Sequence, residues 1–171
     1  MAGLAEARGA GAAGTPPVTR AGAWLAHPWL TVRTGIALGL LFVTAALPKI
    51  VDPPGFAHMI YNYRILPGPL VNASALFLPW FELLAGLALC LGIWRRTAAA
   101  WIGALLLVFI AAISFNLARG NAIDCGCFDP KESGKSVEER LADMRGVVLR
   151  DVGMLLLVGQ VLWAERRRPG A

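Results

Sequence analysis

Two cysteines one residue apart, Cys125 and Cys127, are the residues whose type and spacing point most directly to chemistry. They stand in the run Asp124-Cys-Gly-Cys-Phe128, where Gly126 lets the chain bend at little steric cost. A disulfide needs its two Cα atoms within about 7 Å, which residues i and i+2 satisfy only when the chain bends. The ring closed in this way is small and strained, and strain raises the reduction potential of a disulfide. The pattern therefore favours exchange with a partner over a permanent cross-link.

Two other interpretations of this cysteine pair are an inert disulfide and a surface metal site. Copper(I) accepts two thiolates, but no Met or His cluster stands beside them in the sequence. Two ligands are also too few for a closed zinc site. We predict disulfide exchange with Cys125 and Cys127 as catalytic residues, Asp124 and Gly126 as supporting residues, and no metal.

Charged residues inside apolar runs are a second signal, because an ionisable side chain in hydrocarbon is costly and is usually paired or functional. Glu82 and Asp151 each lie twelve residues before a tryptophan at a span end, so at ~1.5 Å per residue both sit ~18 Å from that boundary. Arg150 lies one residue further from that boundary than Asp151. Lys49 lies nearer the opposite surface, where its side-chain stem either reaches out to water or turns inward. We predict an intramembrane charged network of these four residues, in which Lys49 or Arg150 compensates Glu82. Its role is either a structural ion pair between helices or a part in proton or electron transfer.

The charged residues must be carried by apolar helices, and the amino-acid composition contains enough apolar residues to form such helices. Of the 171 residues, 57% are apolar and only 16% are charged, and the mean hydropathy is +0.59. This balance excludes a soluble enzyme. The net charge of +5 comes from basic residues at span ends and tails without interleaved aromatics, so no nucleic-acid partner is expected. Four apolar runs, 34–47 with flanks at 32 and 50, 70–93, 97–117 and 147–163, predict an all-α integral membrane four-helix bundle.

An even number of spans places both termini on one side of the membrane, together with the short turn that holds Arg95 and Arg96. Lys and Arg are equally numerous on the two sides, so their placement decides the orientation. Because the Arg95-Arg96 pair and the arginine run 166–168 adjoin span ends, we predict that both termini are cytoplasmic. Residues 1–30 are then a disordered cytoplasmic tail and 165–171 a basic cytoplasmic tail. The loops 49–69 and 118–146, the second with the Cys-Gly-Cys run, face the exterior.

The ends of two spans carry further signals. Ser136 and Glu139 have the spacing of a capping box and precede apolar residues at helical spacing. The fourth helix is therefore predicted to begin outside the membrane. Cys90, a lone thiol near the opposite end of the second span, is interpreted as a packing residue that cannot bridge to the cysteine pair.

Six short motifs are spread along the apolar part of the chain. In chain order they are Leu47-Pro-Lys49, Tyr61-Asn-Tyr-Arg-Ile-Leu-Pro67, Leu78-Pro-Trp-Phe-Glu-Leu-Leu-Ala-Gly86, Arg119-Gly120, Asp124-Cys-Gly-Cys-Phe128 and Leu149-Arg-Asp151. Together they resemble the methylamine-utilisation protein MauE family, within the broader group of DoxX-like membrane proteins. The resemblance runs from about residue 31 to 163, so we expect one four-transmembrane-helix domain of this type over residues 31–164.

The resemblance implies a four-helix bacterial cell-membrane protein tied to disulfide chemistry in the envelope. In the namesake methylamine system, the family assists maturation of a disulfide-rich methylamine dehydrogenase subunit, together with a thioredoxin-like partner. It also implies that Cys125 and Cys127 are the redox pair. The charged positions that match the family are Lys49, Glu82, Arg119, Arg150 and Asp151. One departure is that Asp129-Pro130 follows Phe128 where the family commonly has Gly, which bears on the local turn and on partner geometry.

From residues and resemblance together, we predict an integral membrane thiol–disulfide redox protein that supports disulfide formation or maturation of an envelope protein, as in amine metabolism. Its expected partners are the lipid bilayer and a thioredoxin-like envelope protein. A membrane quinone is a candidate recycling acceptor and no other cofactor is predicted; it is suggested only by a disulfide that needs a recycling route and by the charged groups at one depth. The alternative is a non-catalytic membrane anchor or small-solute carrier, in which the Glu82 group lines a pathway and the cysteines only latch the loop.

Overall fold

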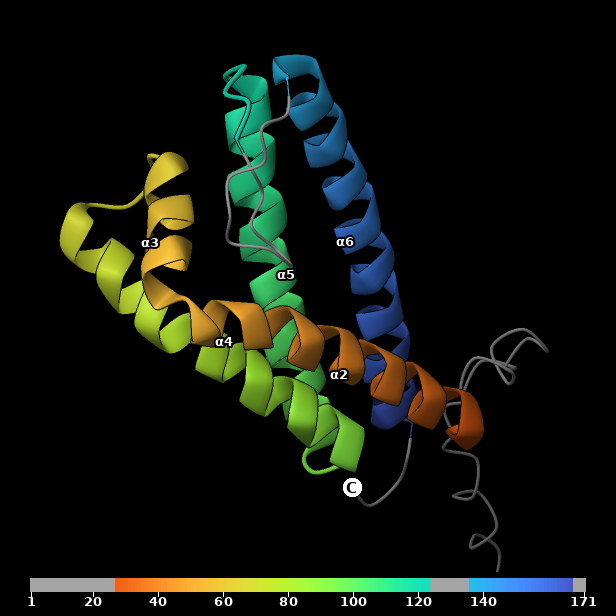
Figure 1. The fold of residues 1–171 in the computed structure, drawn as a ribbon. Coiled ribbons are helices and arrows are strands. Elements are labelled where there is room, and N and C mark those ends of the chain that lie inside the picture. The colour runs from red at the N-terminus through yellow and green to blue at the C-terminus, as the bar shows by residue number, and fades with distance from the viewer. Residues whose placement is uncertain (1–26, 124–135, 168–171) are drawn as a thin grey trace, which may run out of the picture.

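The computed structural model describes residues 27–123 and 136–167, and the regular elements in these two stretches are all α-helices. In chain order they are α2 (Pro28–Val51), α3 (Pro53–Asn62), α4 (Gly68–Leu91), α5 (Arg95–Ala118) and α6 (Val137–Arg166), as Figure 1 shows. The predicted all-α fold class is confirmed.

Four of these helices, α2, α4, α5 and α6, are long and apolar enough to cross a membrane. The first three have 24 residues each and α6 has 30. At ~1.5 Å per residue they measure about 36 and 45 Å, against a hydrocarbon core of about 30 Å. The four apolar runs of the sequence therefore correspond to four helices of spanning length.

Helix α6 begins ten residues before the apolar run 147–163 because a capping box starts it. The Ser136 hydroxyl accepts a hydrogen bond from the Glu139 N–H at 3.3 Å, and the Glu139 carboxylate accepts one from the Ser136 N–H at 2.8 Å. These reciprocal bonds satisfy backbone donors that the first turn of a helix leaves open. The capping box predicted from the spacing is confirmed.

Helix ends also extend into both predicted tails. Helix α2 starts at Pro28, inside the range 1–30, because proline fits the first helical turn and the His27 side chain accepts a hydrogen bond from the Trp29 N–H at 3.3 Å. Helix α6 continues to Arg166, inside the range 165–171, where a cation suits the negative end of the helix dipole. Residues 1–26 and 168–171 lie outside the described residues.

Helix α3 lies within the segment 49–69 that we expected to be a loop. Asp52 starts it by accepting a hydrogen bond from the Gly55 N–H at 3.0 Å, and two prolines occupy its first positions. One face of α3 is buried through Phe56 and Met59, which are 4% and 1% exposed. The Asp-Pro-Pro start was readable in the sequence, since both residue types favour the beginning of a helix.

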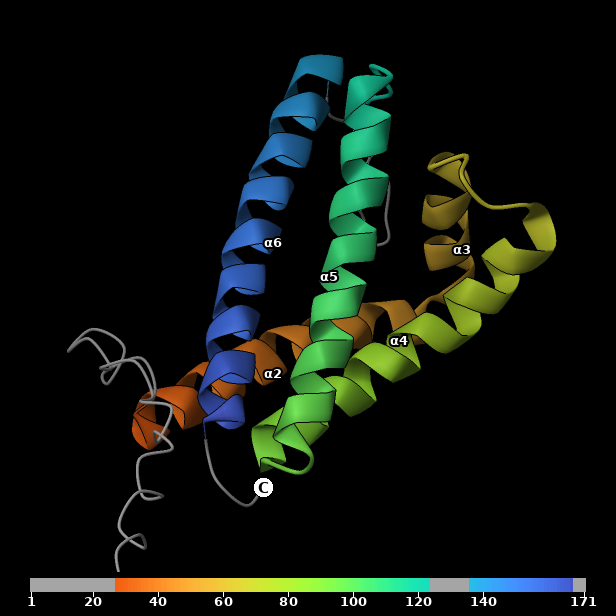
Figure 2. The same cartoon turned by 180° about the vertical axis from the view of Figure 1, so that it is seen from behind.

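The spanning helices pack as two pairs. Figures 1 and 2 show α5 and α6 side by side as an upright hairpin, while α2 and α4 lie against each other and cross that hairpin at a steep angle. Where the pairs meet, the buried core includes Leu38, Leu89, Ile102 and Val158. The start of α2, the α4–α5 turn and the end of α6 lie at one end of the molecule. The end of α5 and the start of α6 lie at the opposite end.

The α2–α4 crossing is close because two glycines face each other there. A Cβ atom on Gly39 would come within 2.6 Å of the Gly86 carbonyl oxygen, and one on Gly86 within 2.8 Å of the Gly39 carbonyl oxygen. Small residues permit this approach of two membrane helices. Cys90 lies at the same crossing, with its thiol 3.7 Å from the Ile36 carbonyl oxygen, which agrees with a packing role.

Candidate functional site: two buried ion pairs around one cavity

The first ion pair joins α2 to α4. The Lys49 ammonium donates hydrogen bonds to both carboxylate oxygens of Glu82, at 2.7 and 3.0 Å. Lys49 is 3% exposed and Glu82 is 1% exposed. Of the two arrangements considered for Lys49, the structure has the inward one, and Lys49 rather than Arg150 compensates Glu82.

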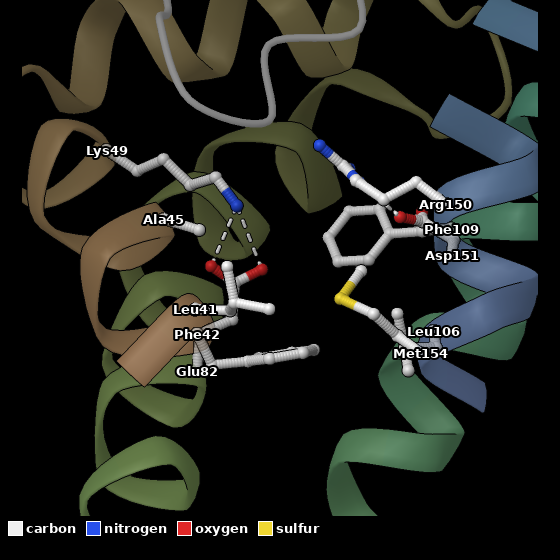
Figure 3. Close-up of a pocket in the computed structure, with 10 residues that line it drawn as sticks. All are labelled: Leu41, Phe42, Ala45, Lys49, Glu82, Leu106, Phe109, Arg150, Asp151 and Met154. Atoms are coloured by element: carbon white, nitrogen blue, oxygen red, sulfur yellow. Dashed lines mark hydrogen bonds and ion pairs between the residues drawn. The ribbon is translucent and has the colours of Figure 1, made fainter. Parts of the chain in front are cut away.

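The sequence places both partners by helix periodicity. Lys49 stands in the last turn of α2, where a cation suits the helix dipole. Glu82 belongs to the buried stripe of α4, whose other members are Val71, Ala75, Pro79, Ala85, Gly86 and Leu89. The stripe has a spacing of three to four residues and faces the bundle. A lysine stem that reaches inward from the helix end therefore meets this carboxylate, as Figure 3 shows.

Two aromatic rings flank the Lys49 ammonium. Its nitrogen lies 5.2 Å from the centre of the Phe56 ring of α3 and 5.3 Å from that of the Phe109 ring of α5. Both distances allow a cation–π attraction. The ammonium thus contacts three helices besides its own. Sequence reasoning missed Phe56 and Phe109, because an aromatic in an apolar run has no signal that separates it from ordinary core residues.

The second ion pair lies within α6. The Arg150 guanidinium donates two hydrogen bonds to Oδ1 of Asp151, at 3.0 and 2.9 Å. The Asp151 side chain is 3% exposed, whereas the Arg150 side chain is 36% exposed. This pair is therefore local in sequence, whereas the first pair joins two helices.

A small cavity of about 40 Å³, partly open at the surface of the bundle, lies between the two pairs. Figure 3 shows Lys49 and Glu82 on one side and Arg150 and Asp151 on the other, with Met154 and Phe109 between them. The remaining lining residues are Leu41, Phe42, Ala45 and Leu106. The structure thus brings together the four residues of the predicted charged network. The equal depth of Glu82 and Asp151 in the membrane, expected from their spacing to a tryptophan, stays a prediction.

Arg119 is separate from this network. It caps the C-terminus of α5, is exposed, and holds its guanidinium 5.2 Å from the centre of the Phe115 ring one turn earlier. It lies at the end of the molecule from which the chain continues toward the cysteine pair. Within the residues that the structure describes, no three His, Cys, Asp or Glu side chains come together as metal ligands.

Cys125 and Cys127, with Asp124 and Gly126, lie outside the described residues, but both flanks of their segment are described. Ile123, which is 9% exposed, packs in a small core with Ile113 and Met144. On the other flank the capping box fixes the start of α6. The two flanking residues, Ile123 and Ser136, are thus held at the end of the bundle opposite the Arg95-Arg96 turn (Figure 1).

A second hollow, of about 470 Å³, lies beside the Ile123 anchor. Arg64 and Arg140 line it, together with asparagine side chains and Gly120. Arg64 has φ 51° and Gly120 has φ 68°, so two backbone turns on its wall are in the left-handed region that few residues adopt. Two arginines thus lie on the wall of a hollow next to Ile123, the last described residue before the cysteines.

The amino-acid sequence of the chain is similar to those of known proteins. Residues 27–164 match the family described as methylamine utilisation protein MauE. The chain is 35% identical over 150 residues to a methylamine utilization protein MauE of Methylorubrum extorquens, covering 87% of this chain and 77% of the relative. It is also 35% identical over 137 residues to the protein of that name from Paracoccus denitrificans, covering 80% and 73%. No solved structure matches the chain.

Proposed function

Since the chain belongs to the family of methylamine utilisation protein MauE, we propose that it is a membrane thiol–disulfide exchange protein that serves methylamine metabolism. The exchanging pair is Cys125 and Cys127. The partner is a thioredoxin-like envelope protein, and the client is an envelope protein whose disulfides must form. The metabolic context follows from the names of the relatives, and the chemistry follows from the cysteine spacing.

The observation that carries the proposal is that the described residues on both sides of the cysteine segment, Ile123 and Ser136, are held in place. Ile123 is packed into the α5–α6 core two residues before Cys125, and the Ser136 cap fixes the chain after it. A partner therefore meets the pair next to a defined surface. This end is opposite the Arg95-Arg96 turn, so cytoplasmic termini place the pair outside, where disulfides form and persist.

The proposed exchange involves two pairs of sulfur atoms, those of Cys125 and Cys127 and those of two cysteines of the partner. A thiolate of the partner attacks one sulfur of the Cys125–Cys127 disulfide, the S–S bond breaks, and a mixed disulfide forms. The second partner thiolate attacks that bond and releases Cys125 and Cys127 as thiols, which take up the two protons given up by the partner. The partner is oxidised by two electrons and this protein is reduced by two. The reverse sequence passes the disulfide the other way.

A quinone ring does not fit the cavity between the ion pairs. The cavity measures about 40 Å³, whereas a cavity that holds benzene measures about 150 Å³. The charged network therefore does not serve as a quinone site in this conformation, and the proposed exchange uses no step through that group.

Trapping of the mixed disulfide tests the proposal. In a methylamine-using bacterium that lacks its own copy, we expect Cys125→Ser or Cys127→Ser to accumulate a disulfide with a thioredoxin-like envelope protein, identified by mass spectrometry. Cys90→Ser is the matched control and should leave growth on methylamine unchanged. The trapped yield should fall with added salt, because Arg64 beside Ile123 favours an acidic partner surface. If no partner is trapped and the double serine variant still grows, the result would instead support the alternative function, a non-catalytic membrane anchor or small-solute carrier.

A further inference from the structure

Among the described residues that line the small cavity, four carry a charge, and these charges balance each other. Lys49 and Arg150 supply two positive charges, and Glu82 and Asp151 supply two negative charges. A cation or an anion gains nothing overall in such a site. A small neutral molecule with a dipole fits it, because it can donate to a carboxylate and accept from an ammonium or guanidinium.

The size of the cavity selects water among such molecules. A buried water needs roughly 10–15 Å³ of cavity and two to four polar partners, so about 40 Å³ has room for about three. The partners are present: Lys49 uses its ammonium twice on Glu82 and carries three N–H donors. Both Arg150 bonds fall on Oδ1 of Asp151, which leaves Oδ2 as an acceptor for a donor in the cavity.

We infer that this cavity holds water, and that the water joins the two ion pairs into one proton-exchange site. A proton enters from the Arg150 side, where the guanidinium is partly exposed, and protonates Asp151. Water then accepts that proton from Asp151 while it donates another to Glu82. The net change is one proton moved from one carboxyl to the other, with no electrons transferred. This inference holds whether or not Cys125 and Cys127 exchange disulfides.

Radiolytic labelling of the full chain in lipid nanodiscs tests the water. Hydroxyl radicals made from bound water oxidise neighbouring side chains, and Met154 lines the cavity. Met59 and Met144, which are 1% and 0% exposed and do not line it, are internal controls. We expect several-fold more oxidation at Met154 than at either control.

A cavity-filling variant shows whether the oxidation of Met154 comes from water in the cavity or from water elsewhere. Ala45→Leu adds carbon atoms to the cavity wall, and it should bring Met154 oxidation down to the level of the controls. Ala104→Leu adds the same atoms at an exposed position of α5 and should change nothing. Equal oxidation of the three methionines, or a Met154 signal that Ala45→Leu leaves intact, would mean that the cavity is dry and the inference is wrong.

Infrared spectroscopy of the same samples tests proton exchange. On acidification we expect a carboxylic-acid band that is partly lost in Glu82→Gln and partly lost in Asp151→Asn, while Glu138→Gln, at an exposed site, leaves it unchanged. Coupling through water further requires that Asp151→Asn shift the pH at which the remaining Glu82 band appears. Independent titration of the two groups would overturn the inference. If Glu82→Gln fails to fold, the shift measured in Asp151→Asn still decides between the two results.

Discussion

The α2–α4 pair and the α5–α6 pair each contain glycines and an ion pair, but these residues make different contacts in the two pairs. In the α2–α4 pair, glycines bring backbone against backbone, and a buried ion pair connects residues 33 positions apart. In the α5–α6 pair, Gly103 instead receives the Val158 side chain, at 3.1 Å from an added Cβ, and the ion pair joins adjacent residues of α6. The comparison teaches that an ion pair fixes the positions of two helices only when its partners lie on different helices, whereas a glycine contacts the neighbouring helix in both pairs.

The largest expected effect is that of Glu82→Gln. It leaves the Lys49 ammonium buried without its counter-charge, which costs about 3–5 kcal/mol when a buried pair loses one partner. Unfolding of the purified protein in detergent measures the loss. Replacing both residues, as Lys49→Met with Glu82→Met, should recover much of that stability because no charge is left buried. A double variant no more stable than the single one would contradict the role of the pair as a cross-link.

Gly86→Ala at the α2–α4 crossing should have the next largest effect. Its Cβ would lie 2.8 Å from the Gly39 carbonyl oxygen, so the two helices must separate, at a cost of about 1–3 kcal/mol. Gly35→Ala, on the same face of α2, is the matched control, because its nearest neighbours lie at an ordinary 3.7 Å. Thermal unfolding that ranks both variants equally would show that backbone contact does not set this crossing.

Asp151→Asn should cost less than Glu82→Gln although the aspartate is equally buried. The Arg150 side chain is 36% exposed and reaches polar surroundings without Asp151, so we expect a loss of about 1 kcal/mol. Unfolding in the same detergent gives the comparison. A loss as large as that of Glu82→Gln would mean that the α6 pair also ties helices together.

The smallest expected change is that of Gly153→Ala on α6. An added Cβ there meets no atom within 4 Å, and alanine favours the helix by up to about 1 kcal/mol over glycine. The variant should be as stable as the parent chain or slightly more so. Destabilisation in the nanodisc-embedded protein would reveal a partner on this face of α6.

The sequence predicted the four helices because each apolar run is long, and polar caps account for the extra length of α6. It named Glu82 and Asp151, which line one cavity in the structure, while their common depth in the membrane stays a prediction. It did not decide between Lys49 and Arg150 as the partner of Glu82, because that choice depends on how the helices are rotated and crossed. Helix α3 was missed because its apolar face is short, although Asp52 and the prolines marked its start.

The single residue Asp52 both ends α2 and begins α3. Its N–H donates to the Pro48 carbonyl oxygen at 3.1 Å, and its side chain accepts from Gly55. This joint sets the number of residues between Lys49 and Phe56, and one inserted residue would turn α3 by about 100° and carry Phe56 away from the ammonium. We therefore expect an insertion between Lys49 and Phe56 to remove the ring from the ammonium, whereas a substitution in the joint keeps their spacing.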